Sequence, residues 1–157
     1  MVELIKPVGN LSEENLRKVE NEFGVEFPAD YRRFLLQFNG GRPSPAAFDI
    51  AWRNEQACGD DWKTSEVSRF LAIHDGDKAN FVQINRVDFR GRLPADTVAI
   101  AQDPGGNVIL LAVKGPMAPR VLFWVKDHEV GEGRKSSYEN VGIVADSFED
   151  LLNDKLR

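Results

Sequence analysis

The sequence is poor in the side chains that most often carry covalent, redox or metal chemistry, with one cysteine and two histidines among 157 residues. The single cysteine, Cys58, cannot form an internal disulfide, which favours a reducing, cytoplasmic compartment. Cys58 could also be a nucleophile, but no nearby residue in the sequence resembles its base. A zinc site would combine Cys58 with His74 and His128, whose positions show none of the short paired spacings of zinc motifs. We therefore expect neither a metal nor an organic cofactor.

Long apolar runs are also absent, since none approaches the roughly 20 residues that span a bilayer. The first seven residues, MVELIKP, lack the apolar segment and the cleavage site of a signal peptide. Together these observations predict a cytoplasmic protein with no membrane partner.

Basic residues are in deficit, because 20 Lys and Arg against 25 Asp and Glu give a net charge of −5. A nucleic-acid-binding protein needs a basic surface, so we expect no nucleic-acid partner. A basic protein partner is compatible with this charge.

What the chain does contain is the composition of a globular domain. Hydrophobic residues make up 42 % of it and charged residues 29 %. A chain of this length buries about two thirds of its unfolded surface when it folds. No repeat, low-complexity segment or linker divides the sequence, so we predict a single domain over residues 1–157.

Two helices are predicted near the N-terminus. Ser12 is a typical N-cap, and apolar residues at helical spacing follow it as far as Gly24. Pro28 suits the first position of a second helix, which ends at the sequence Asn39-Gly40-Gly41. The short connection between the helices predicts an αα-hairpin. We interpret the aromatic and apolar stripe of the second helix as core; it consists of Tyr31, Phe34, Leu35 and Phe38.

The rest of the chain favours strands. Alternation or short apolar runs predict strands over residues 48–52, 70–73, 97–102, 107–113, 120–126 and 141–144. Residues 77–90 have helical spacing with Asp77 as the N-cap, and Ser147 caps a final helix. The polar segments 53–68 and 128–138 are interpreted as loops. The predicted fold is α+β, with a central, mostly antiparallel sheet, an N-terminal αα-hairpin and a C-terminal helix.

An acidic, glycine-rich turn, Asp103-Pro104-Gly105-Gly106-Asn107, separates two of the predicted strands. Its composition would suit a phosphate, a metal ion or a purely structural turn. No Lys-Ser or Lys-Thr pair follows, as a phosphate-binding loop requires, and a strand rather than a helix comes next. We interpret the segment as a hairpin turn in which Gly105 and Gly106 supply positive φ, while the side chains of Asp103 and Asn107 bond nearby backbone.

Two other polar segments contain the residue types of catalytic or metal sites. Residues 75–86 begin like a calcium-binding loop, but Asn80 stands where that loop needs glycine and Arg86 where it needs a bidentate glutamate. Residues 127–129, Asp-His-Glu, follow a predicted strand, on which adjacent side chains point to opposite faces. No G-x-S-x-G motif and no paired acid and base are present. We therefore expect a protein without enzymatic activity.

Four separated segments form an ordered set of motifs. They are residues 27–41 (FPADYRRFLLQFNGG), 100–107 (IAQDPGGN), 121–129 (VLFWVKDHE) and 144–152 (VADSFEDLL). In order and rough spacing this set resembles the SMI/KNR domain of the SUKH superfamily, from about residue 11 onward. The chain departs from the pattern at Phe27, where leucine is usual, and where Val125-Lys126 interrupts a tighter Trp-Asp-His-Glu sequence. The motif positions are Tyr31, Asn39, Gly40, Gly41, Asp103, Gly105, Gly106, Asn107, Trp124, Ser147 and Phe148.

The resemblance implies an α+β fold with a largely antiparallel sheet, in which these motif positions are structural. It also implies a role in binding. Many bacterial members are immunity proteins that neutralise a cognate toxin, often a nuclease, and fungal members are interaction hubs that regulate cell-wall synthesis. Neither role uses catalysis.

The leading hypothesis is therefore a non-catalytic immunity protein whose partner is a basic cognate toxin. The residues proposed for the interface combine aromatic anchors with acids that steer association: Trp52, Asp60, Asp61, Trp62 and Glu129. The alternative for the two tryptophans is that they belong to the core. The alternative for the whole protein is a small-ligand or nucleotide sensor, or a regulatory scaffold, that uses the Asp103–Asn107 turn.

Overall fold

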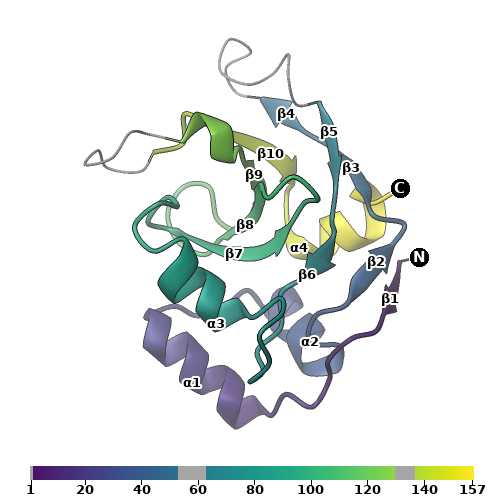
Figure 1. Cartoon of the computed structure of the whole chain (residues 1–157), viewed down its shortest axis with the longest axis vertical. Coiled ribbons are helices and arrows are strands. Elements are labelled where there is room, and N and C mark those ends of the chain that lie inside the picture. Colours follow the sequence, from purple (N-terminus) through teal and green to yellow (C-terminus); the bar gives the residue numbers. More distant parts are fainter. Residues whose placement is uncertain (1, 53–62, 130–136) are drawn as a thin grey trace.

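A six-stranded antiparallel sheet forms the centre of the computed structural model, which describes residues 2–52, 63–129 and 137–157 (Figure 1). Its spatial order is β4 (Ala51–Trp52), β10 (Val141–Ala145), β9 (Val121–Trp124), β8 (Val108–Ala112), β7 (Thr97–Gln102) and β6 (Arg69–Phe70). Two small antiparallel pairs accompany it: β1 (Glu3–Ile5) with β2 (Arg42–Ser44), and β3 (Ala47–Asp49) with β5 (Thr64–Glu66). The mostly antiparallel sheet predicted from the sequence is confirmed.

The helices begin where their caps place them. Helix α1 (Glu13–Phe23) starts after Ser12, whose hydroxyl oxygen accepts a hydrogen bond from the Asn15 amide at 3.1 Å, and ends at Gly24 with φ 64°. Helix α2 (Ala29–Gln37) follows directly and completes the predicted αα-hairpin. Pro28 is the N-cap of α2, one position before the expected one. No helix within the described ranges is long and apolar enough to cross a bilayer.

Two further helices are short and continue as π-helix. Helix α3 (Phe81–Gln83) leads into η2 (Ile84–Asp88), and helix α4 (Phe148–Asp150) leads into η4 (Leu151–Lys155). The predicted cap of the C-terminal helix is confirmed, because the Ser147 hydroxyl oxygen accepts a hydrogen bond from the Asp150 amide at 3.0 Å.

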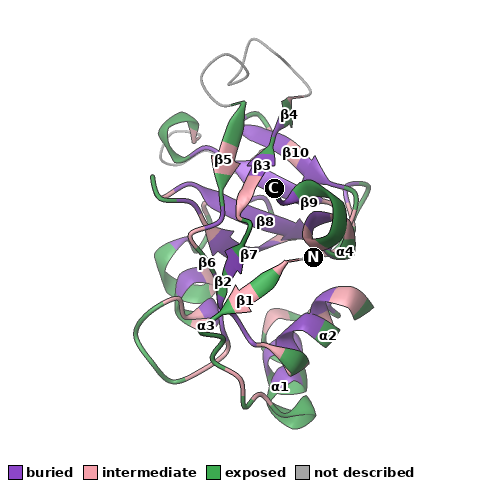
Figure 2. Cartoon of the chain, turned by 90° about the vertical axis from the view of Figure 1, so that its right-hand side faces the viewer, coloured by how far each residue is buried: buried purple, intermediate pink, exposed green. Residues whose placement is uncertain are grey.

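The core lies between the central sheet and the helices, and Figure 2 shows its strands as the most deeply buried part of the fold. Strands β8 and β9 are buried along their whole length. Aromatic rings join α2 to α4 and to β6: Phe34 lies 4.9 Å from Phe148 and 5.0 Å from Phe70 between ring centroids. The aromatic stripe of α2 is therefore core, as its spacing predicted.

The strand predicted over residues 48–52 is wrong as a single element. Its residues belong to two strands, β3 and β4, which pair with β5 and β10 respectively. Ile50 stands between them, and a Cβ on Gly142 would lie 2.4 Å from the Ile50 Cγ2 atom. The alternation correctly reported which side chains face inward, but it carries no information about which strand pairs with which.

The start of the third helix also differs from the prediction. Asn80, not Asp77, is the N-cap, and its side-chain oxygen accepts a hydrogen bond from the Gln83 amide at 3.0 Å. Ala79 has φ 49°, a left-handed conformation that no helix can continue through. The N-cap therefore lies three residues later than the sequence suggested.

The remaining differences concern the number and the length of the strands. The sequence predicts a loop over residues 53–68, but Thr64–Glu66 form strand β5, which pairs with β3. The strand predicted over residues 70–73 is only the two-residue β6, after which Ala72 makes a parallel bridge with Asn80. The strand predicted over residues 120–126 ends at Trp124 and gives way to a 3₁₀ turn, η3 (Lys126–His128). The pairing of β1 with β2 was not predicted from the sequence.

Candidate functional site

Two of the four motif segments meet at one end of the central sheet. Strand β8 pairs with β7 through Gln102 and Val108, and with β9 through Val108 and Trp124. Trp124 in turn pairs with Val141 of β10. This row of the sheet adjoins the turns that we call the hairpin end, defined as residues 103–107, 125–129 and 138–140 (Figure 1).

The Asp103–Asn107 turn closes the β7–β8 hairpin through its own polar groups. The Asp103 amide donates to the Asn107 carbonyl at 3.0 Å, and the Asn107 amide donates to Asp103 Oδ1 at 2.7 Å. The Asn107 side-chain amide donates to Asp103 Oδ2 at 3.0 Å. The predicted hairpin is confirmed, with one correction: Gly106 has positive φ, 88°, whereas Gly105 has none.

The same side chains tie the turn to its neighbours. Ser65 of β5 donates its hydroxyl to Asp103 Oδ2 at 2.9 Å, and the Lys126 amide donates to Asn107 Oδ1 at 3.0 Å. Asn140 donates its side-chain amide to the Val125 carbonyl at 2.8 Å. We call Ser65, Asp103, Asn107 and Asn140 the polar framework; the last three are 5 %, 3 % and 2 % exposed.

This geometry bears on the small-ligand alternative. Both carboxylate oxygens of Asp103 accept hydrogen bonds from the chain, and the Asn107 side chain uses both its donor and its acceptor. A cavity of about 380 Å³ lies beside the turn and is lined partly by Pro104 and Gly105. The groups that would recognise a ligand are thus engaged inside the protein, which favours the structural interpretation of the turn.

Glu129 is held by an arginine that sequence reasoning missed. Arg92 donates from Nε to Glu129 Oε2 at 3.1 Å and from Nη2 to Oε1 at 2.8 Å. Its guanidinium carbon lies 4.6 Å from the centroid of the Phe89 ring and 5.9 Å from that of Trp124. The hydrogen bonds that Arg92 donates to Glu129 raise the pKa of the Arg92 guanidinium above its ordinary value. Since 37 residues separate the pair, no local pattern could have revealed it.

The other residues of the predicted interface have different outcomes. Trp52 is partly buried and packs on Gly142, where a Cβ would lie 3.2 Å from two atoms of the indole ring. It stands one row of the sheet further from the hairpin end than Trp124, because its partner Gly142 pairs with Phe123. Asp60, Asp61 and Trp62 lie outside the described residues, as does Cys58. Within the described ranges, no three His, Cys, Asp or Glu side chains gather as a metal site.

The comparison with protein families supports the resemblance found in the sequence. The model of the SMI1 / KNR4 family (SUKH-1) matches residues 10–154. The chain belongs to this family. It is also similar to the SPbeta prophage-derived uncharacterized protein YokK of Bacillus subtilis (strain 168), with 25 % identity over 150 residues, covering 88 % of this chain and 71 % of the relative.

The remaining SUKH-1 motif positions lie away from the hairpin end and connect segments. Asn39, with φ 51°, donates to the Gly9 and Ile73 carbonyls at 3.1 and 2.8 Å and accepts from the Ile73 amide at 2.9 Å. A Cβ on Gly40 would lie 2.9 Å from that of Ala72, so this close approach requires glycine. Gly41, with φ 107°, forms a β-bridge with Phe70.

Tyr31, another motif position, is fully buried beside Phe148, with ring centroids 5.0 Å apart. Its hydroxyl has no hydrogen-bond partner among the described residues, and burial raises the pKa of that hydroxyl. The SUKH-1 motif residues thus divide into those that join the helical layer to the sheet and those that build the hairpin end.

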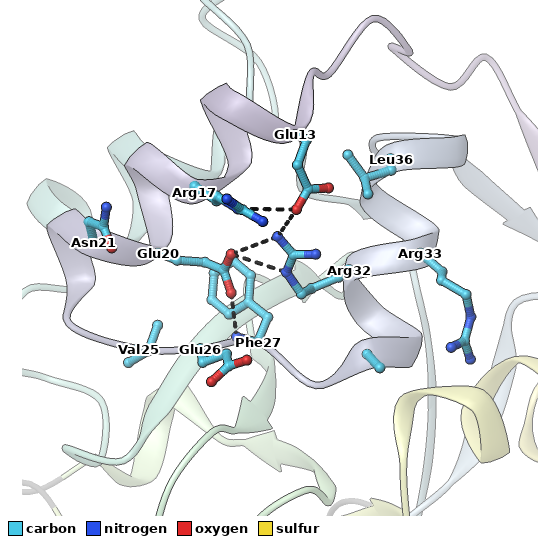
Figure 3. Close-up of a pocket in the computed structure, with 11 residues that line it drawn as sticks. Glu13, Arg17, Glu20, Asn21, Val25, Glu26, Phe27, Arg32, Arg33 and Leu36 are labelled. Atoms are coloured by element: carbon cyan, nitrogen blue, oxygen red, sulfur yellow. Dashed lines mark hydrogen bonds and ion pairs between the residues drawn. The ribbon is translucent and has the colours of Figure 1, made fainter.

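A groove of about 670 Å³ between α1 and α2 is a second candidate site (Figure 3). Arg32 reaches across it and forms ion pairs with Glu13 and Glu20. The buried Glu20 also accepts a hydrogen bond from the Phe27 amide at 2.8 Å. The hydrogen bond from Arg32 lowers the pKa of the Glu13 carboxyl. Arg32 therefore pairs with the buried Glu20 and with the exposed Glu13, and these ion pairs connect the two helices of the αα-hairpin.

Proposed function

We propose that this protein is a non-catalytic binding module that acts as an immunity protein and masks a basic toxin. The observation that carries the proposal is membership of the SMI1 / KNR4 family over residues 10–154, because the family resemblance implies this role for many bacterial members. The similarity to a prophage-derived protein of Bacillus subtilis supports a bacterial setting in which such systems would occur.

The hairpin end supports the proposal as a binding surface. Its polar framework is satisfied inside the chain, so its outward side chains are not needed to complete the turns. Among the outward residues, Asp127 and Glu139 are exposed and Glu129 is partly exposed. Functional residues are typically carried on turns that a rigid scaffold positions, and carboxylates of this kind steer association with a basic partner.

The test is protection of cells from the toxin encoded by the neighbouring gene. Co-expression of this protein should restore growth, and the purified protein should bind the purified toxin with an association rate that falls as salt rises. A toxin that kills equally well with and without this protein would refute the proposal.

A matched pair of charge reversals tests the surface. Asp127→Lys changes the hairpin end, whereas Asp154→Lys makes the same charge change on η4. We expect Asp127→Lys to slow association about tenfold or more at low salt, since reversal of a charge at the rim of an interface acts mainly on the association rate. Asp154→Lys should have a much smaller effect. Equal effects would place the interface elsewhere.

A further inference from the structure

The ion pair between Arg92 and Glu129 holds the Glu129 carboxylate in a fixed orientation, unlike a loose ion pair on a protein surface. Both donors of the Arg92 fork that face the carboxylate are used, at 3.1 and 2.8 Å, one on each oxygen. A third Arg92 nitrogen, Nη1, donates to the Asp88 carbonyl at 3.2 Å. The orientation of the guanidinium, and with it that of the carboxylate, is therefore set from two sides.

The face of the guanidinium is fixed as well. The Phe89 ring lies 4.6 Å away and is itself packed edge-on against Trp124, with ring centroids 5.7 Å apart. Trp124 is 1 % exposed, so this aromatic support belongs to the core. Arg92 is thus a bridge from the core to a carboxylate at the surface. An ordinary surface pair lacks such support and holds its carboxylate only loosely.

The carboxylate keeps unused capacity on its outer side. A carboxylate has about four lone-pair sites. Within the described part of the chain, the side-chain hydrogen bonds to Glu129 come from Arg92, one to each oxygen. The Glu129 side chain is 31 % exposed, so a partner can reach it. A second guanidinium or ammonium can therefore bind there without displacing Arg92, and the side-chain entropy that binding normally costs is already lost.

We propose that Arg92 is a positioning residue that holds Glu129 ready to bind a cationic side chain, arginine or lysine, of a protein partner. The proposal rests on the binding function above and names the group that recognises the partner. The alternative is that the ion pair between Arg92 and Glu129 is purely structural. The contacts of Arg92 within the chain fit both roles, so an experiment must separate them.

A charge swap separates the two roles. The double variant Arg92→Glu with Glu129→Arg retains an ion pair between the two positions but turns the exposed carboxylate into a cation. If the pair is only structural, the swap should bind the purified toxin like the wild type. If Glu129 receives a cation, the swap should weaken binding about 100-fold or more, because a like-charge contact replaces an attraction. The matched control is the swap of Arg86 and Glu22, a half-exposed pair of the same kind 3.2 Å apart.

A milder variant keeps the proposal testable if the charge swap prevents folding. Glu129→Gln keeps the shape and removes the charge, and we expect it to weaken binding about tenfold and to reduce the salt dependence of association. Arg92→Gln should weaken binding similarly with Glu129 intact, while Arg92→Lys, which keeps the charge but not the fork, should recover part of the loss.

The outcomes are distinguishable. If the wild-type protein neither binds nor protects against the toxin, the proposed function fails and this inference falls with it. If the wild type binds, but Glu129→Gln and the swap bind equally well while remaining folded, only this inference is overturned. Loss of binding in both, with the Arg86 and Glu22 control unchanged, supports it.

Discussion

Truncation of Asp103 should destabilise the protein more than any other single change at the hairpin end. Asp103→Ala removes the acceptors of the Asn107 amide at 2.7 Å, the Asn107 side-chain amide at 3.0 Å and the Ser65 hydroxyl at 2.9 Å. Asn107 is 3 % exposed, so two donors lose their partner without access to bulk water. Each buried, unsatisfied donor costs about 1–3 kcal/mol, which gives about 4 kcal/mol in total. The Ser65 hydroxyl adds little, because it can rotate toward another acceptor.

The measurement is equilibrium unfolding in urea, followed by fluorescence. A change of midpoint without a change of slope would report stability alone. Two further variants grade the effect. Asp103→Asn keeps one acceptor but places its side-chain NH₂ group against that of Asn107, so we expect a loss of about 1–3 kcal/mol in the free energy of unfolding. Ser65→Ala removes one of the three hydrogen bonds to Asp103 and should cost less than about 1 kcal/mol. A loss below about 1 kcal/mol for Asp103→Ala would refute the assignment of these hydrogen bonds as the framework of the turn.

Three other predictions test separate parts of the fold by the same unfolding measurement. Gly106→Ala should cost about 1 kcal/mol because φ is 88° there, whereas Gly105→Ala, whose Cβ would meet its nearest atoms at 3.6 Å, should be nearly neutral. Tyr31→Phe should raise stability by about 1 kcal/mol, since it removes a buried hydroxyl without a partner in the described ranges; a clear loss would show that the hydroxyl is bonded. Glu20→Gln should cost about 2 kcal/mol or more, because Glu20 is buried. Glu22→Gln should cost at most about 0.5 kcal/mol, because its ion pair is half-exposed. Similar losses for the two variants would contradict the reasoning from burial.

Features that depend on a few adjacent residues could be predicted from the sequence. The caps at Ser12 and Ser147 and the left-handed end of α1 at Gly24 each depend on one side chain or one glycine next to a helix. The Asp103–Asn107 turn depends on five residues. In these places the chemistry that forms the structure is contained within the segment, so the sequence pattern was sufficient.

Features that depend on contacts between residues far apart in the sequence could not be predicted. Arg92 and Glu129 are 37 residues apart, and Asn140 reaches the Val125 carbonyl across 15 residues. The division of residues 48–52 between two sheets depends on Gly142, which leaves room for Ile50. Each of these contacts is decided by tertiary packing, which outweighs local preference. An asparagine directly before an apolar run was the one signal that could have identified Asn140.

At the hairpin end, the buried polar groups bond one another, while the exposed side chains take no part in those bonds. The exposed residues can therefore be substituted with little effect on stability. Substitutions of exposed residues such as Asp127 and Glu139 usually change stability by less than about 0.5 kcal/mol, while loss of Asp103 should cost several times more. If the hairpin end is the binding surface, as we propose, substitutions of its exposed residues can change the partner while the polar framework is retained. Asp103→Ala should accordingly weaken binding of the purified toxin only to the extent that it unfolds the protein, and added urea should exaggerate the defect. If Glu129 binds the partner as we propose, Glu129→Gln should weaken binding of the purified toxin by more than the loss of its ion pair with Arg92 destabilises the fold.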